Sequence, residues 1–341
     1  MLLLNIFLMQ PLLLLGWTGL LGIGYEVLVV RVLSQVAEDT VYTFAMLLAV
    51  YLVGSALGAA AWQRWLARHA DTQALRDRLL QWLAGACLLG TLSLWGAEHV
   101  KAWALAALPP GMAAAVAAEA ALAVAAFGLP TLVMGALFSH LATEARAAGI
   151  GLGRALGVNT LGAAAAPLLF GVVLVPQLGP KASLLLVAAG YLALASARGW
   201  KRPGFWAPAT AAIALAVLSP PLAFIDVPDG GRVVSYREGA MAAVSVVEDA
   251  AGVSRLRINN RQQEGSSSTL LADARQALLP VLLHPSPRHA LFLGLGTGLT
   301  SSSAAEDPAL DVDAVELLPE VIEASAHFTQ VFQGGQPNAR L

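Results

Sequence analysis

The sequence predicts a membrane-embedded helical bundle followed by a small antiparallel β-sheet and the beginning of an α/β domain. Composition is the first reason: of 341 residues, 57% are hydrophobic and only 12% are charged, whereas soluble proteins carry about 25% charged residues. Distribution is the second reason, because long apolar runs fill the chain up to Phe224 and charged residues return at soluble density from Ile225 onward. The third is a glycine cluster that follows an apolar run, in LFLGLGTGLT.

Seven apolar stretches qualify as membrane spans, each of which needs about 20 mostly apolar residues. They cover residues 9–30, 41–62, 79–97, 112–139, 156–176, 182–197 and 205–224. The segment KAWALAALPPG, between the third and the fourth, is apolar but short and contains two prolines, so it fits an interfacial or re-entrant piece. We therefore expect an all-α polytopic bundle of about seven spans, with six to eight left open.

The basic residues of the loops predict the orientation of this bundle. The loops after the second, fourth and sixth spans carry nine of them: Arg64, Arg68, Arg76, Arg78, Arg146, Arg154, Arg198, Lys201 and Arg202. The alternate loops carry three: Arg31, Lys101 and Lys181. This bias places the N-terminus in the cytoplasm, and seven spans then place the following domain on the outer face.

Polar residues inside the apolar stretches are candidates for function, because a charge at the centre of a bilayer costs about 2.5–3.5 kcal/mol or more. Glu26 and Arg31 lie five residues apart at the end of the first stretch, and Asn159 opens the fifth, followed by small residues that let helices approach closely. One interpretation is a polar pathway through the bundle. The alternative, which we favour, is that these residues stabilise helix packing and helix ends.

The chain is expected to divide at residues 1–224, 225–265 and 266–341. Residues 232–260 alternate apolar and polar positions between turn signals, which predicts an antiparallel hairpin or small sheet. Residues 268–283 have helical spacing and end just before a histidine and two prolines. A strand, a glycine turn, a helix, a second strand and a second helix are expected to follow.

The glycine turn has the sequence context of a cofactor loop. Gly294, Gly296 and Gly298 follow a buried strand and precede a helix, so the backbone can approach a cofactor closely and the helix N-terminus adds a positive field. Glu316 comes 22 positions after Gly294, at the end of the next strand, where an acid can accept hydrogen bonds from ribose hydroxyls. The spacing G-x-G-x-G lacks the later glycine of the dinucleotide pattern, which favours an S-adenosyl cofactor over NAD or FAD.

Several stretches resemble the spermidine synthase (polyamine aminopropyltransferase) family, in its bacterial form fused to an N-terminal multi-span domain. GYEVLVVRVLSQVAEDTVYTFAMLLAVYLVGSALGA and GRALGVNTLGAAAAPLLFGVVLVPQLG look like the fused membrane domain. REGAMAAVSVVED, LRINNRQQ, LLPVLLHPSPRHALFLGLGTG and VDAVELLPEVIEAS look like the synthase domain, in the same order. The resemblance covers almost the whole chain.

This resemblance implies a small β-sheet followed by a Rossmann-like α/β domain of the methyltransferase type. It also implies transfer of an aminopropyl group from decarboxylated S-adenosylmethionine to a polyamine, without a metal. Gly294, Gly296 and Gly298 would form the cofactor loop, Glu316 would hold the ribose, and Gln263 would touch the cofactor. The protein would be integral to the bacterial inner membrane, and a homo-oligomer is left open.

The chain departs from the family in two respects. The positions that correspond to the family's acidic pair are Ser268 and Thr269, which puts putrescine as acceptor in doubt. The later strands and the catalytic Asp of the family have no counterpart before Leu341, so we expect an incomplete Rossmann-like domain, no nominated catalytic residue and an inactive 341-residue form. A cytosolic cofactor also conflicts with the outer-face placement, so the side of the soluble domain stays unresolved.

Two other functions remain open. One is a transporter-like membrane protein whose soluble part binds a ligand without catalysis, and the other is a methyltransferase that uses ordinary S-adenosylmethionine. The net charge of −2 argues against a nucleic-acid surface. No metal constellation is visible, and the single cysteine, Cys87, excludes an internal disulfide framework.

Overall fold

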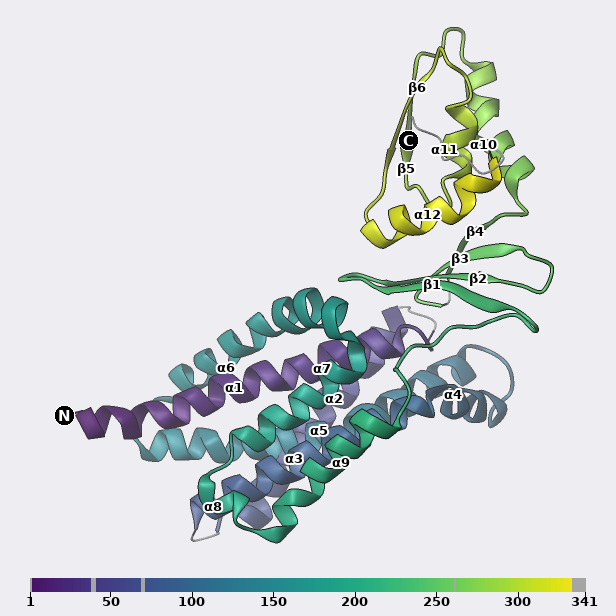
Figure 1. The fold of residues 1–341 in the computed structure, drawn as a ribbon. Coiled ribbons are helices and arrows are strands. Elements are labelled where there is room, and N and C mark those ends of the chain that lie inside the picture. Colours follow the sequence, from purple (N-terminus) through teal and green to yellow (C-terminus); the bar gives the residue numbers. More distant parts are fainter. Residues whose placement is uncertain (1, 38–40, 69–70, 261, 333–341) are drawn as a thin grey trace. The chain divides into compact units, whose positions relative to one another are not determined.

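The computed structural model describes residues 2–37, 41–68, 71–260 and 262–332. The chain forms two compact units, Met1–Ala223 and Phe224–Leu341. We call the first the helical unit and the second the sheet unit, because all the strands of the described residues lie in the second (Figure 1). The protein is mostly helical, with several long apolar helices and a small antiparallel sheet.

The helical unit begins with long helices and ends with short ones. Its α-helices are α1 (Leu2–Leu33), α2 (Val41–Ala61), α3 (Thr72–Trp95), α4 (Ala97–Ala106), α5 (Met112–Ala147), α6 (Leu152–Ala166), α7 (Val175–Ala193), α8 (Ala197–Trp200) and α9 (Trp206–Leu218). Three tighter or wider helical turns connect them: η1 (Trp62–Leu66), η2 (Pro167–Leu174) and η3 (Pro203–Phe205).

Four helical runs among the described residues are long and apolar enough to cross a membrane: Gln10–Leu33, Val41–Leu66, Met112–Ala147 and Leu152–Ala193. A fifth is obtained if α3 and α4, which are bent by 68° at their junction, count as one span. The α4 helix carries most of the segment expected to be interfacial or re-entrant. Length and composition therefore make the helical unit compatible with a membrane-spanning bundle.

Three predicted stretches differ from the helices observed. The stretch 156–176 and most of the stretch 182–197 fall in the 42-residue run Leu152–Ala193, whose one non-helical residue is Gly179 (φ 76°, ψ 167°). The stretch 205–224 becomes the shorter apolar helix Pro203–Leu218. It ends there because the Ser219-Pro220-Pro221 sequence cannot continue a helix.

Glycines let the long helices touch through their backbones. A Cβ added to Gly58 of α2 would lie 1.8 Å from the carbonyl oxygen of Leu132 in α5, and one added to Gly135 of α5 would lie 2.0 Å from that of Ser55 in α2. Between α1 and α6, a Cβ on Gly162 would lie 2.0 Å from the carbonyl oxygen of Gly16. Small residues at helix contacts allow this close approach, which is also typical of membrane helix bundles.

The sheet unit opens with a four-stranded antiparallel meander, which confirms the small sheet expected from the alternating pattern. The strands are β1 (Arg232–Glu238), β2 (Ala243–Glu248), β3 (Ser254–Ile258) and β4 (Gln262–Ser266), in that spatial order. Asn259 and Asn260 follow β3 with φ of 48° and 61°, a conformation that asparagine tolerates better than most residues.

A strand–helix–strand segment follows the meander. Its elements are α10 (Leu270–Leu283), β5 (His289–Leu293), α11 (Leu299–Ala304), β6 (Asp311–Val315) and α12 (Pro319–Phe332). β5 and β6 are parallel, with Leu291 opposite Asp313. One core joins the meander to α11 and α12 through Val246, Leu256, Leu299 and Phe328.

The β5–β6 pair is covered unequally on its two faces. One face packs on α10 and α11, where Ala277, Ala304 and Leu310 are buried and Phe292 lies against them. On the other face, Leu293 is 83% exposed. Parallel strands are usually covered on both faces, so one apolar face of this pair is open in the described chain.

Candidate functional site

The glycine loop occupies residues 294–298, between β5 and α11, where the sequence predicted it. Its three glycines adopt positive φ: 99° at Gly294, 55° at Gly296 and 76° at Gly298. The Gly294 N–H donates to the Val315 carbonyl at 2.8 Å, which ties the loop to the end of β6. A Cβ added to Gly294 would meet no atom within 4 Å, so open space lies above the backbone there.

Glu316, from the end of β6, binds this loop directly. Its Oε2 accepts hydrogen bonds from the N–H groups of Leu295 at 2.9 Å and Gly296 at 3.5 Å. Its Oε1 accepts from the N–H groups of Leu317 at 2.8 Å and Leu318 at 3.0 Å. A carboxylate has about four lone-pair sites, so all the acceptor capacity of Glu316 is used within the protein.

These hydrogen bonds also set the charge of Glu316. Partial burial, the largest single influence, raises the pKa of its carboxyl, but the four backbone N–H donors together outweigh burial and hold that pKa below its ordinary value. Glu316 is therefore an anion at neutral pH, and the positive φ angles of the glycines turn two loop N–H groups toward it. The six residues of α11 are too few for the helix field that the sequence suggested to add much.

The edge strand β4 lies against the glycine loop. A Cβ on Gly265 of β4 would lie 2.7 Å from Cγ2 of Thr297, and one on Gly296 would lie 3.2 Å from the carbonyl oxygen of Glu264. Gln263, which directly precedes these β4 residues and is opposite Arg257 in the sheet, is exposed. The structure thus brings the strand of Gln263, the three glycines and Glu316 together in one part of the sheet unit.

The three polar candidates of the helical unit do not form one cluster. Glu26 is half-buried and Arg31 is buried, and no ion pair joins them in the described part of the chain. Asn159 of α6 donates from Nδ2 to the carbonyl of Leu15 in α1 at 2.9 Å. Asn159 also lines a cavity of about 320 Å³ between the helices, which neither charged residue lines.

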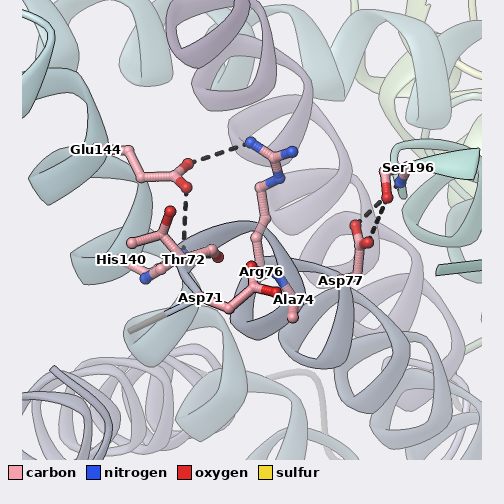
Figure 2. A network of polar contacts seen from close by, with 8 residues as sticks. All are labelled: Asp71, Thr72, Ala74, Arg76, Asp77, His140, Glu144 and Ser196. Carbon is pink, nitrogen blue, oxygen red and sulfur yellow. Dashed lines mark hydrogen bonds and ion pairs between the residues drawn. The ribbon is translucent and has the colours of Figure 1, made fainter. Parts of the chain in front are cut away.

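A second group of polar residues, none of them among the predicted site residues, connects α3 with α5 (Figure 2). Arg76 of α3, only 8% exposed, donates to Oε2 of Glu144 at 3.3 Å. His140 lies one turn before Glu144 on α5, 3.5 Å from its Oε1 and 3.0 Å from the Thr72 carbonyl. The i, i+4 spacing of His140 and Glu144 is the one sequence signal from which this pair could have been predicted.

Asp77 extends this group to the short helix α8 (Figure 2). It is 3% exposed and accepts hydrogen bonds from the backbone N–H of Ser196 at 3.0 Å and from the Ser196 hydroxyl. Ser196 also caps α8, and Asp71 caps α3 by accepting from the Ala74 N–H at 2.9 Å. Because each of these groups has a partner on another element or at a helix end, we interpret this network as structural.

Comparison of the chain with protein families, with curated proteins and with solved structures finds no match. No group of three or more His, Cys, Asp or Glu residues suited to a metal occurs among the described residues. Interpretation of the site therefore rests on its own geometry and on the motifs of the sequence.

Proposed function

We propose that the sheet unit binds a nucleoside cofactor of the S-adenosyl type at the glycine loop, in a Rossmann-like domain of the methyltransferase type. The observation that carries this proposal is the link between loop and acid: three glycines with positive φ after β5, and Glu316 from the end of β6 hydrogen-bonded to two loop residues. In parallel α/β sheets, ligands bind at the carboxyl ends of the strands, which is where both features lie.

The residues present fit such a cofactor. Open space at Gly294 gives a ligand access to the backbone. Glu316 already accepts four hydrogen bonds from the protein. The one from the Gly296 N–H, at 3.5 Å, is the longest of the four, so a ribose hydroxyl would replace it most readily as the donor to Glu316. Gln263 on the adjacent strand would contact the cofactor from the side of the small sheet.

We further propose, from the resemblance to the spermidine synthases, that the cofactor is decarboxylated S-adenosylmethionine and the acceptor a polyamine. When bound, this cofactor supplies an aminopropyl carbon activated by a sulfonium leaving group. The chain's own contribution is to hold the nucleoside: glycine backbone against the cofactor and Glu316 at the ribose. We nominate none of the described residues as the general base for the acceptor amine.

We place the protein in the bacterial inner membrane through its long apolar helices, with the sheet unit on the cytoplasmic side, where such a cofactor is made. Seven spans with this distribution of basic residues would put the sheet unit on the outer face. If the short helix Pro203–Leu218 does not cross the membrane, six of the seven predicted stretches remain and the sheet unit lies on the cytoplasmic side. The 16 residues of this helix would extend about 24 Å, against about 30 Å for a bilayer core. Reporter fusions after residue 226 measure the side directly, and an external reporter signal would contradict the cytoplasmic placement.

A thermal-shift comparison tests the cofactor. The purified full chain in detergent is heated alone, with S-adenosylmethionine and with the decarboxylated form, because a ligand that binds the folded state raises its melting temperature. We expect a larger rise with the decarboxylated form. An equal or larger rise with S-adenosylmethionine would support a methyltransferase instead, and no rise with either would contradict the proposed site.

A further inference from the structure

The cavity beside Asn159 lies among the helices α1, α2, α3, α5, α6 and α7 and has a volume of about 320 Å³. Its polar lining consists of one amide and five hydroxyls, on Thr18, Tyr51, Ser55, Asn159, Thr160 and Tyr191. Ligand sites typically have volumes of about 300–1,000 Å³ and a few convergent polar groups on an apolar lining. This cavity has those dimensions and that character.

Most of the polar atoms that face the cavity have no partner in the described part of the chain. Tyr51, Ser55 and Thr160 make no hydrogen bond through their hydroxyls, and the Asn159 amide uses only its Nδ2, leaving Oδ1 as a free acceptor. The hydroxyl of Tyr191, a residue that is 0% exposed, is also unpartnered, and it lies 3.5 Å from where a Cβ on Gly22 would sit.

Other hydroxyls of the same unit behave differently. Serines and threonines in its helices bond the carbonyl one turn earlier; these are Thr91, Thr131, Ser139, Thr143 and Ser183, at 2.7–2.9 Å. Ser55 and Thr160 lie within helices and have the same carbonyls within reach, yet their hydroxyls are not engaged. Of the cavity groups, Thr160 is exposed and Tyr51, Ser55 and Asn159 are half-buried, whereas Tyr191 is fully buried. Because buried polar groups in proteins are nearly always hydrogen-bonded, the orphaned Tyr191 hydroxyl, together with the unengaged groups around the same cavity, indicates a ligand.

The chemistry of the lining defines the ligand. None of the lining residues is Asp, Glu, Lys, Arg or His, so a charged ligand would lose its hydration without gaining a counter-charge. Hydroxyls both donate and accept, whereas Asn159 Oδ1 only accepts, so the ligand needs at least one donor. Glu26 lies one turn beyond Gly22 on α1, outside the lining.

We propose that this cavity binds a small uncharged molecule that carries hydroxyl groups, with Tyr51, Ser55 and Asn159 as its hydrogen-bonding partners. Liquid water occupies about 30 Å³ per molecule, so a ligand on the order of ten non-hydrogen atoms fills this volume. The site is independent of the glycine loop and is not part of the proposed transferase chemistry.

Cysteine protection tests this proposal on the full chain. Cys87, the single native cysteine, is buried, so a Cys87→Ala background gives a chain without reactive thiols. Ser55→Cys and Thr160→Cys are introduced separately, and their alkylation by N-ethylmaleimide is followed with and without glycerol, xylitol or myo-inositol. Thr210→Cys, at an exposed position of α9, is the matched control. Choline and gluconate are the charged competitors.

We expect both cavity cysteines to be alkylated, and at least one of the three polyols to slow that reaction severalfold while leaving Thr210→Cys unaffected. Asn159→Leu, added to Ser55→Cys, should weaken the protection because it removes the amide acceptor. Protection by choline would overturn the assignment to an uncharged ligand and indicate a cation that pairs with Glu26. Alkylation that no polyol slows would overturn the site, leaving a cavity that holds only water.

Discussion

The helical unit and the sheet unit use glycine in opposite ways. In the helical unit, Gly58 and Gly135 sit in helices where an added Cβ would overlap a carbonyl oxygen of the neighbouring helix, at 1.8 Å and 2.0 Å. In the sheet unit, Gly294 has a φ of 99° and an added Cβ would meet nothing. Glycine is needed at Gly58 and Gly135 because the neighbouring helix leaves no room for a side chain. It is needed at Gly294 because the backbone there has a positive φ angle.

This difference separates packing glycines from candidate ligand-binding glycines in a chain that contains 32 of them. A glycine in contact with another backbone brings two helices together. A glycine at positive φ beside open space turns the chain and leaves its backbone accessible. The same substitution, to alanine, should therefore damage the two units through different mechanisms.

Gly58→Ala should be the most damaging of these changes. The new methyl group would force α2 away from the backbone of α5, and overpacking of this kind costs about 3 kcal/mol. All eight tryptophans of the chain lie before residue 207, so thermal unfolding followed by tryptophan fluorescence in detergent reports on the helical unit. Gly85→Ala is the control, because a Cβ at Gly85 meets nothing within 4 Å and alanine favours the helix. Equal losses at both positions would refute the packing role.

Glu316→Gln should destabilise the sheet unit by about 2 kcal/mol at neutral pH, because a carboxylate that accepts several backbone hydrogen bonds is replaced by an amide with one acceptor oxygen. The folded pKa of Glu316 is below its ordinary value, so its contribution is complete above the unfolded pKa of about 4.3. It is lost as the pH falls through the lower folded pKa.

Hydrogen exchange of peptides from residues 290–320, followed by mass spectrometry, checks this prediction. The wild-type chain should be better protected than Glu316→Gln at pH 7, and the difference should shrink as the pH falls below about 4. A difference that stays constant from pH 7 to pH 3 would show that the effect does not come from the ionised carboxylate.

Gly294→Ala should cost about 1.5 kcal/mol, because a residue with a Cβ is strained at positive φ even where space is free. The loss should appear in the exchange of the loop peptides, while tryptophan fluorescence of the helical unit stays unchanged. If Gly294→Ala were as stable as the wild-type chain, the loop would not hold the backbone conformation described above.

Tyr25 and Tyr191 give the smallest and most closely matched comparison, since both are 0% exposed. The Tyr25 hydroxyl donates to the Ala126 carbonyl at 3.0 Å, so Tyr25→Phe should lower stability by about 1 kcal/mol. The Tyr191 hydroxyl has no partner, so Tyr191→Phe should leave stability unchanged or raise it. A larger loss for Tyr191→Phe would reveal a hydrogen bond that the structure lacks.

The sequence was most informative where periodicity and turn chemistry act locally. The alternating residues of 232–260 predicted the antiparallel meander, and the order of apolar run, glycines and acid led to β5, the loop and Glu316. The sequence could not show that the Glu316 carboxylate accepts hydrogen bonds from four backbone N–H groups, because these contacts depend on the three-dimensional path of the loop. The donors belong to Leu295, Gly296, Leu317 and Leu318.

Tertiary contacts decide what the sequence left open in the helical unit. Glu26 and Arg31 looked like partners because they are close in the chain, whereas Arg76 and Glu144, a pair that the described residues do show, are 68 residues apart. Hydrophobicity predicts helices over residues 156–176 and 182–197 but does not reveal the backbone break at Gly179. Asn159 was identified for its polarity, and only the structure places it with Tyr51 and Ser55.

Calorimetric titration of the purified full chain with decarboxylated S-adenosylmethionine tests the central claim most directly. If the glycine loop and Glu316 form the cofactor site, the wild-type chain should bind one molecule with saturable heat. Glu316→Gln should then bind at least about tenfold more weakly, the loss expected for a hydrogen bond to a charged group. An absence of binding to the wild-type chain, or equal affinity in the variant, would contradict the account.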